Sequence, residues 1–198
     1  MRAAALIAAA VLLGLLSAQG SYALWNVGTS AAPGTVSAAS FTVNLTGSPS
    51  GQVWPMTLAG GQAASLALIT QAAALTPGTA VYAGALVGNA SDAGGAFSID
   101  VTAGAPAVTS AGNGSLSPYL TVDAKTATST DACATATGYA PLTAAGLTSA
   151  AVPKGGSTVL CFEVKLSSAA PATVKGQSVS ITIPLTARQL CGVPGGCA

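Results

Sequence analysis

The sequence predicts an all-β protein, specifically a two-sheet β-sandwich of jelly-roll type. Short segments alternate apolar and polar residues, and clusters of Gly, Pro, Ser and Asn separate these segments. Beyond residue 23, no segment has a convincing helical period. Because so many short strands cannot bury their apolar faces in one layer, we expect two packed sheets around one core.

The expected strands follow one another from residue 41 to residue 185. In the first, Phe41, Val43 and Leu45 alternate with polar residues, and in the second, residues 52–58, Pro55 suits an edge strand or a bulge. The others cover residues 65–69, 81–87, 97–101, 120–122, 158–166 and 179–185. Ala-rich residues 62–74 and 142–151 have room for a turn or two of helix each.

The strand at residues 158–166 has the clearest pattern. One face carries Leu160, Phe162, Val164 and Leu166, and the other carries Cys161, Glu163 and Lys165. We therefore expect Cys161 on the outer side of its sheet, where a disulfide with Cys133 would tether a covering loop. In the last predicted strand, Pro184 indicates an end at a sheet edge.

Composition excludes several functional classes. Only 6% of the residues are charged, against roughly 25% in typical soluble domains, and the formal net charge is +1. This balance gives no electrostatic basis for binding nucleic acid or an anionic membrane surface. The chain has no His, which removes every mechanism that needs a His base, a His metal ligand or a Ser-His-Asp triad.

The N-terminus has the pattern of a secretory signal peptide. Arg2 precedes an apolar stretch at residues 3–16, and small residues follow, so that cleavage fits after Ala18 or after Ala23. The alternative is a retained anchor, but the stretch is shorter than the roughly 20 residues of a spanning helix. We expect an exported protein with no stable membrane insertion after cleavage, located outside the cell or on its surface.

The four cysteines, an even number in a chain expected to be exported, predict two disulfides. Three pairings are possible, and we favour the sequential one. Its members are Cys133 with Cys161, and Cys191 with Cys197. A zinc site is a poor alternative, because the chain has neither a C-x-x-C pair nor a His.

Known catalytic motifs are absent from the sequence. There is no phosphate-binding loop, no G-x-G-x-x-G and no S-x-x-K. The five carboxylates are candidates for an acid–base pair, but we expect most of them on solvated surfaces: Asp92, Asp100, Asp123, Asp131 and Glu163. The scattered Tyr and Trp residues are expected to pack inside or between the sheets rather than to form a sugar platform. We therefore expect no catalytic site, no metal and no cofactor.

Residues 20–26 (Gly-Ser-Tyr-Ala-Leu-Trp-Asn) and 34–43 resemble the start of the TasA/camelysin family of exported bacterial proteins. Residues 75–79 and 179–189 resemble the turn and the closing strand of that family more loosely. Ala39 stands where the family has a Gly, Asn44 stands near its usual Asp, and the loop between Cys133 and Cys161 is an addition. The bias toward Ala, Gly and Thr resembles an actinobacterial version.

The resemblance implies cleavage after Ala23, before Leu24, by a SipW-type signal peptidase. Residues 1–23 would be the signal peptide, 24–40 an N-terminal segment and 41–198 the sandwich. The family implies a jelly-roll protein of extracellular matrix fibres, in which the N-terminal segment pairs as a strand with the next copy or with a related matrix subunit. The expected assembly residues are Leu24, Trp25, Asn26, Val27 and Val36. Metalloprotease activity, described for camelysin, is not carried over because no His or ligand cluster is present.

Two other functions remain open. A secreted adhesin or glycan-binding module would use exposed aromatic residues, and Trp54 and Tyr139 are its candidates. An enzyme that uses paired carboxylates is a weaker alternative.

Overall fold

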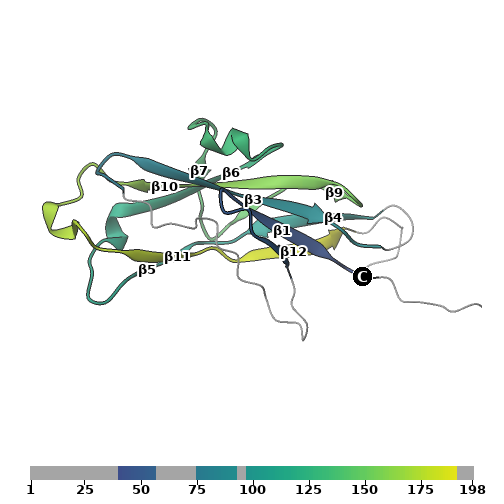
Figure 1. Cartoon of the computed structure of the whole chain (residues 1–198), viewed down its shortest axis with the longest axis horizontal. Helices are drawn as coiled ribbons and strands as arrows, with labels where there is room; N and C mark the ends of the chain where they lie inside the picture. Colours follow the sequence, from purple (N-terminus) through teal and green to yellow (C-terminus); the bar gives the residue numbers. More distant parts are fainter. Residues whose placement is uncertain (1–39, 57–74, 93–96, 191–198) are drawn as a thin grey trace, which may run out of the picture. The chain divides into compact units, whose positions relative to one another are not determined.

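The computed structural model describes residues 40–56, 75–92 and 97–190. The chain divides into two units, Met1–Ala38 and Ala39–Ala198, and every described residue belongs to the second unit. Strands dominate this part of the chain, as the sequence predicts (Figure 1). The described helices are short 3-10 turns: η1 (Ser117–Tyr119), η2 (Asp131–Ala134) and η3 (Ala172–Val174).

The larger sheet has six antiparallel strands in the order β2-β1-β3-β10-β6-β7. Its two longest strands, β3 and β10, have ten residues each and lie side by side at its centre. The strands are β1 (Val43–Ser48), β2 (Val53–Pro55), β3 (Ala80–Asn89), β6 (Leu120–Ala127), β7 (Ala140–Pro141) and β10 (Ser157–Leu166).

The second layer is narrower and is interrupted by prolines. One part has the order β12-β4-β8, with β9 also paired to β4, and the other part is the pair β11-β5. The Gly104 N–H donates to the Pro184 carbonyl oxygen at 2.8 Å and thereby joins the two parts across the break. The strands are β4 (Ser98–Ala103), β5 (Ala107–Ser110), β8 (Leu147–Thr148), β9 (Val152–Pro153), β11 (Val179–Thr182) and β12 (Leu185–Leu190).

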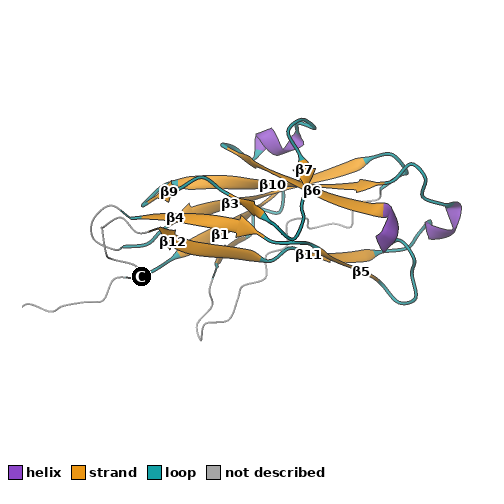
Figure 2. Ribbon diagram, turned by 180° about the vertical axis from the view of Figure 1, so that it is seen from behind, coloured by secondary structure: helices purple, strands orange, loops and turns teal. Residues whose placement is uncertain are grey.

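The hydrophobic core lies between the two layers (Figure 2). The larger sheet contributes Leu160 and Phe162 from β10, and the second layer contributes Ile99 and Val101 from β4. The other buried members are Val43, Leu45, Ala85, Val87, Phe97, Ala103, Ala124, Leu142 and Val152. The described part of the chain therefore has a sandwich-like all-β fold.

Most of the predicted strands are confirmed, but two predictions are wrong. Residues 142–151 form no helix: they contain a turn at Gly146, where φ is +73°, and then β8. The predicted strand at 179–185 is two strands: pairing with β5 ends at Thr182, and after Pro184 the chain pairs with β4 from Leu185 onward. The strand expected at 65–69 and the helical turns at 62–74 lie outside the described residues.

No helix within the described ranges is long and apolar enough to cross a membrane.

Candidate functional site

A disulfide fastens a loop to the outer face of the larger sheet. Cys133 in η2 is bonded to Cys161 on β10, which confirms the predicted pair and the predicted outward direction of Cys161. Both cysteines are buried. Gly84 on the neighbouring strand makes room for them, because a Cβ at Gly84 would lie 2.9 Å from the Cys133 sulfur. The second predicted pair, Cys191 with Cys197, lies outside the described residues.

Two side chains fasten the same loop at further points. The Tyr139 hydroxyl donates to the Cys133 carbonyl at 2.6 Å, and the Lys125 ammonium donates to the carbonyls of Thr135 and Thr137 at 2.6 and 2.9 Å. Lys125 Nζ also lies 4.4 Å from the centre of the Tyr139 ring. Burial, followed by the nearby charges of Glu163 and Tyr82, raises the pKa of Tyr139 to about 12. Tyr139 is therefore engaged within the loop and is not a free sugar-binding platform.

A charged cluster lies on the same outer face, where Glu163 of β10 stands directly opposite Asp123 of β6. Lys165 bridges the two acids, with its Nζ 2.5 Å from Glu163 Oε2 and 3.2 Å from Asp123 Oδ2. The Glu163 side chain is 1% exposed, whereas that of Lys165 is 45% exposed. The expectation of a solvated Glu163 is therefore wrong: the acid is buried and balanced by an ammonium group.

The cluster changes the pKa of Lys165 and of the neighbouring Tyr82, and it borders a recess. Hydrogen bonding to Glu163, and then to Asp123, raises the pKa of Lys165. A hydrogen bond with Glu163 is also the main cause that raises the pKa of Tyr82. Tyr82, Thr121, Glu163 and Lys165 line a recess on this face.

The other three carboxylates lie elsewhere and do not join this cluster. Asp92 accepts a hydrogen bond from the Ser40 N–H at 2.5 Å, which lowers the pKa of Asp92. Asp100 is buried, so the expectation of a solvated surface is wrong for this residue as well, and it accepts from the Arg188 guanidinium at 2.6 Å. Asp131 begins η2. Within the described residues, no group of three His, Cys, Asp or Glu side chains could hold a metal ion.

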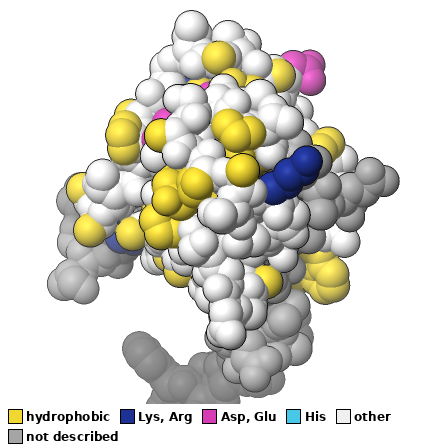
Figure 3. Space-filling model, turned by 90° about the vertical axis from the view of Figure 1, so that its left-hand side faces the viewer, with side chains coloured by type: hydrophobic (Ala, Val, Ile, Leu, Met, Phe, Trp, Pro, Cys, Tyr) yellow, Lys and Arg dark blue, Asp and Glu magenta, His cyan; other side chains and the backbone are white. Residues whose placement is uncertain are grey.

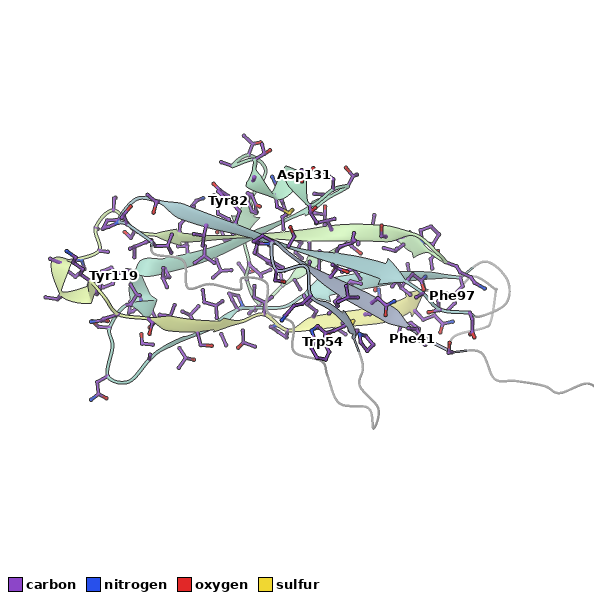
Figure 4. All side chains as sticks on the ribbon, in the orientation of Figure 1. Phe41, Trp54, Tyr82, Phe97, Tyr119 and Asp131 are labelled. Carbon is purple, nitrogen blue, oxygen red and sulfur yellow. A yellow bond between two sulfur atoms is a disulfide. The ribbon has the colours of Figure 1, made fainter. Side chains whose placement is uncertain are left out.

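The aromatic side chains of the described residues lie in several separate places (Figure 4). Trp54 on β2 is 41% exposed, so it does not pack between the sheets as expected for the Tyr and Trp residues, and Phe41 is 49% exposed. Phe41 contacts Phe97 edge to face at 6.2 Å between ring centres. Figure 4 shows Trp54 and Phe41 well separated from Tyr82. Tyr82 and Tyr139 form a separate pair on the outer face of the larger sheet, with ring centres 5.8 Å apart.

Sheet edges are the second candidate feature, and most of them are protected. β2, β7 and β9 are two or three residues long, and each contains a proline: Pro55, Pro141 and Pro153. Proline has no N–H to offer a further strand, so such edges resist pairing with another chain. β8 has only two residues, and the free sides of β5 and β11 offer four residues each.

The edge at β12 is different. β12 has six residues and no proline, and no described strand pairs with the side that faces away from β4. Leu185 and Ala187 pack against the core from this strand. Its one charged residue, Arg188, is engaged with Asp100 on β4. β12 is therefore the longest edge strand in the described part of the chain, and neither a proline nor a short length protects it.

The start of β1 is fastened where the N-terminal segment joins the sandwich. Besides the contact of Asp92 with Ser40, the Ser91 hydroxyl accepts from the Thr42 N–H at 2.9 Å and donates to the Thr42 carbonyl at 3.2 Å. The expected cleavage site at Ala23 lies outside the described residues, as do all five expected assembly residues: Leu24, Trp25, Asn26, Val27 and Val36.

Comparisons with protein-family models, with curated proteins and with solved structures find no match to this chain.

Proposed function

We propose that the protein is a secreted, non-catalytic structural protein that self-assembles into cell-surface or biofilm-matrix fibres by donating its N-terminal segment as a strand. The observation that carries the proposal is the unprotected edge at β12. An extended segment of a second copy would add a strand there through main-chain hydrogen bonds. The jelly-roll strand order is part of the same proposal, with the donated strand widening the narrower second layer.

The proposed donor, residues 24–40, suits this edge in composition. It carries no charged side chain, so it brings no charge that would have to be buried at the junction. The hydrogen bonds at Ser40 and Thr42 fix the point from which this segment leaves the sandwich. A strand that starts from a fixed point loses less freedom on binding than one on a loose tether.

Low surface charge supports the same conclusion. Without Arg2, the chain has five basic and five acidic residues, and Figure 3 shows few charged side chains on the face in view. Net charge far from zero keeps protein molecules apart, and this chain lacks it. A disulfide-tethered β-structure is compatible with a location outside the cell.

Edge substitution tests this proposal. We expect Thr186→Lys on β12 to weaken fibre formation by the mature protein strongly, because a lysine on an edge strand opposes strand addition. Thr46→Lys is the control: Thr46 is half-buried on β1, where it pairs with Val53 of β2 on one side and with Leu86 of β3 on the other. Sedimentation of assembled protein measures the effect. Equal assembly by the two variants would contradict an acceptor edge at β12.

An adhesin is the second candidate function, and the exposed side chain of Trp54 favours it. Under this alternative, monomeric protein binds a glycan and loses that binding on Trp54→Ala. A glycan array that compares the monomer with this variant separates the two functions.

A further inference from the structure

Lys165, Asp123 and Glu163 lie close together on the outer face of the larger sheet. Their strands, β10 and β6, are direct neighbours, and the nitrogen of Lys165 is within 3.2 Å of an oxygen of each acid. The ends of the three side chains thus bring together an amine, a carboxyl group and a second, buried carboxyl group. Two of the five acidic residues of the chain are used in this one place.

We propose that Lys165 and Asp123 condense to an isopeptide bond that joins β10 to β6, with Glu163 moving the protons. Glu163 first takes a proton from the ammonium group and passes it to the Asp123 carboxylate. The neutral Lys165 nitrogen then attacks Asp123 Cγ and forms the C–N bond. Glu163 takes the second amine proton and delivers it to the departing hydroxyl group, so that the Cγ–O bond breaks and water leaves. Glu163 ends ionised, as it began, and no other reactant is needed.

Proximity is the main physical argument for this reaction. Groups held in near-attack positions react with effective concentrations of about 10⁵–10⁸ M, which favours an intramolecular amide over its separated components. The burial of Glu163 limits exchange of its proton with bulk water. Because contacts with the two acids raise the pKa of Lys165, the neutral amine is a minor form. The reaction is therefore slow, but each molecule needs it only once.

The sheet register identifies Asp123 rather than Glu163 as the partner. Glu163 and Lys165 are two residues apart on one strand, so a bond between them would not link β10 to another strand. A bond to Asp123 links two strands that are adjacent in the sheet but 42 residues apart in the sequence. The disulfide at Cys161 attaches β10 to the loop at Cys133, so the new bond would add a separate link between strands.

The mass of the intact, reduced and denatured protein tests the proposal. We expect a mass below that of the sequence by one water molecule, and a peptide from β6 joined to a peptide from β10 after proteolysis. Lys165→Arg keeps a cation but has no competent amine, and Glu163→Gln removes the proton carrier, so both should have their full sequence mass. Asp123→Asn should form the same link with loss of ammonia instead of water.

Three results would overturn the proposal. The first is the full sequence mass for the unsubstituted protein, which would leave the cluster as an ion pair. The second is a loss of water that persists in Lys165→Arg, and the third is a link that forms unchanged in Glu163→Gln. If a variant fails to fold, peptide mapping of the unsubstituted protein still distinguishes a covalent link from an ion pair. None of these measurements depends on self-assembly.

Discussion

Single residues explain how the outer loop fits on the larger sheet. Gly84 lies on β3 beside β10, and the Cys133 sulfur occupies the space that a side chain at Gly84 would need. Gly88, four residues further along β3, has no such neighbour: a Cβ there would meet only the Asn44 carbonyl oxygen, at 4.0 Å. The disulfide therefore leaves no room for a side chain at position 84, whereas packing leaves room for one at position 88.

Gly84→Ala should destabilise the protein by about 1–3 kcal/mol, because the added methyl group overpacks against the disulfide. Gly88→Ala is the matched control and should be neutral or slightly stabilising, since alanine lowers the entropy of the unfolded chain. Urea unfolding of both variants provides the free energies. Equal stabilities for the two variants would show that the disulfide does not crowd Gly84.

Tyr139 makes stability depend on pH in the alkaline range. Its pKa is about 12 in the folded protein and about 10 in an unfolded chain, so the unfolded state loses the proton first. Stability should therefore be full below pH 10 and fall as the pH rises from about 10 to about 12.

Tyr139→Phe should reduce this alkaline loss of stability, while costing about 1 kcal/mol at neutral pH for the lost hydrogen bond to Cys133. Thermal unfolding at several pH values measures both effects. An unchanged slope above pH 10 in the variant would contradict the assignment to Tyr139.

At the scale of strands, alternation in the sequence predicts which residues share one face of a strand. It does not predict which other parts of the chain cover that face. The pattern of residues 158–166 placed Cys161 outward, and its pairing with Cys133 followed. The same pattern placed Glu163 outward, but its burial depends on a loop and a neighbouring strand far away in the sequence. The sequence therefore identifies the acidic residues one by one, but it does not predict the charged cluster of Glu163, Asp123 and Lys165.

Two other elements were wrongly predicted for reasons of context. Residues 142–151 are rich in Ala, which favours a helix, but pairing with β4 overrides this weak preference. Pro184 suggested the end of the last strand, yet its carbonyl accepts from Gly104 and the chain resumes pairing directly after it. The edge at β12 was therefore not predicted, although its residues continue the alternation.

The disulfide is the element that should contribute most to holding the outer loop. It spans 28 residues in the sequence, and closing a loop of that length should stabilise the folded state by about 3–4 kcal/mol. Cys133→Ala combined with Cys161→Ala should lower the free energy of unfolding by about this amount. Chemical denaturation at neutral pH measures it, and a loss below about 1 kcal/mol would contradict the estimate from chain entropy.

At the scale of the whole molecule, low charge and the long edge at β12 favour association. Prolines and short lengths protect the edges at β2, β7 and β9, whereas β12 has neither protection. Such an uneven distribution is expected if one edge has a partner. The proposed partner is the N-terminal segment of another copy. Hydrogen bonds at Ser40 and Thr42 fix the point at which this segment joins the sandwich.

The central claim is tested most directly by negative-stain electron microscopy of purified protein over a range of concentrations, comparing residues 24–198 with residues 40–198. The account predicts fibres from the longer chain and a folded, unassembled monomer from the shorter one, because only the longer chain carries the strand to donate. Circular dichroism confirms that the shorter chain is folded. Fibres from residues 40–198, or monomers alone from residues 24–198 at every concentration, would contradict the account.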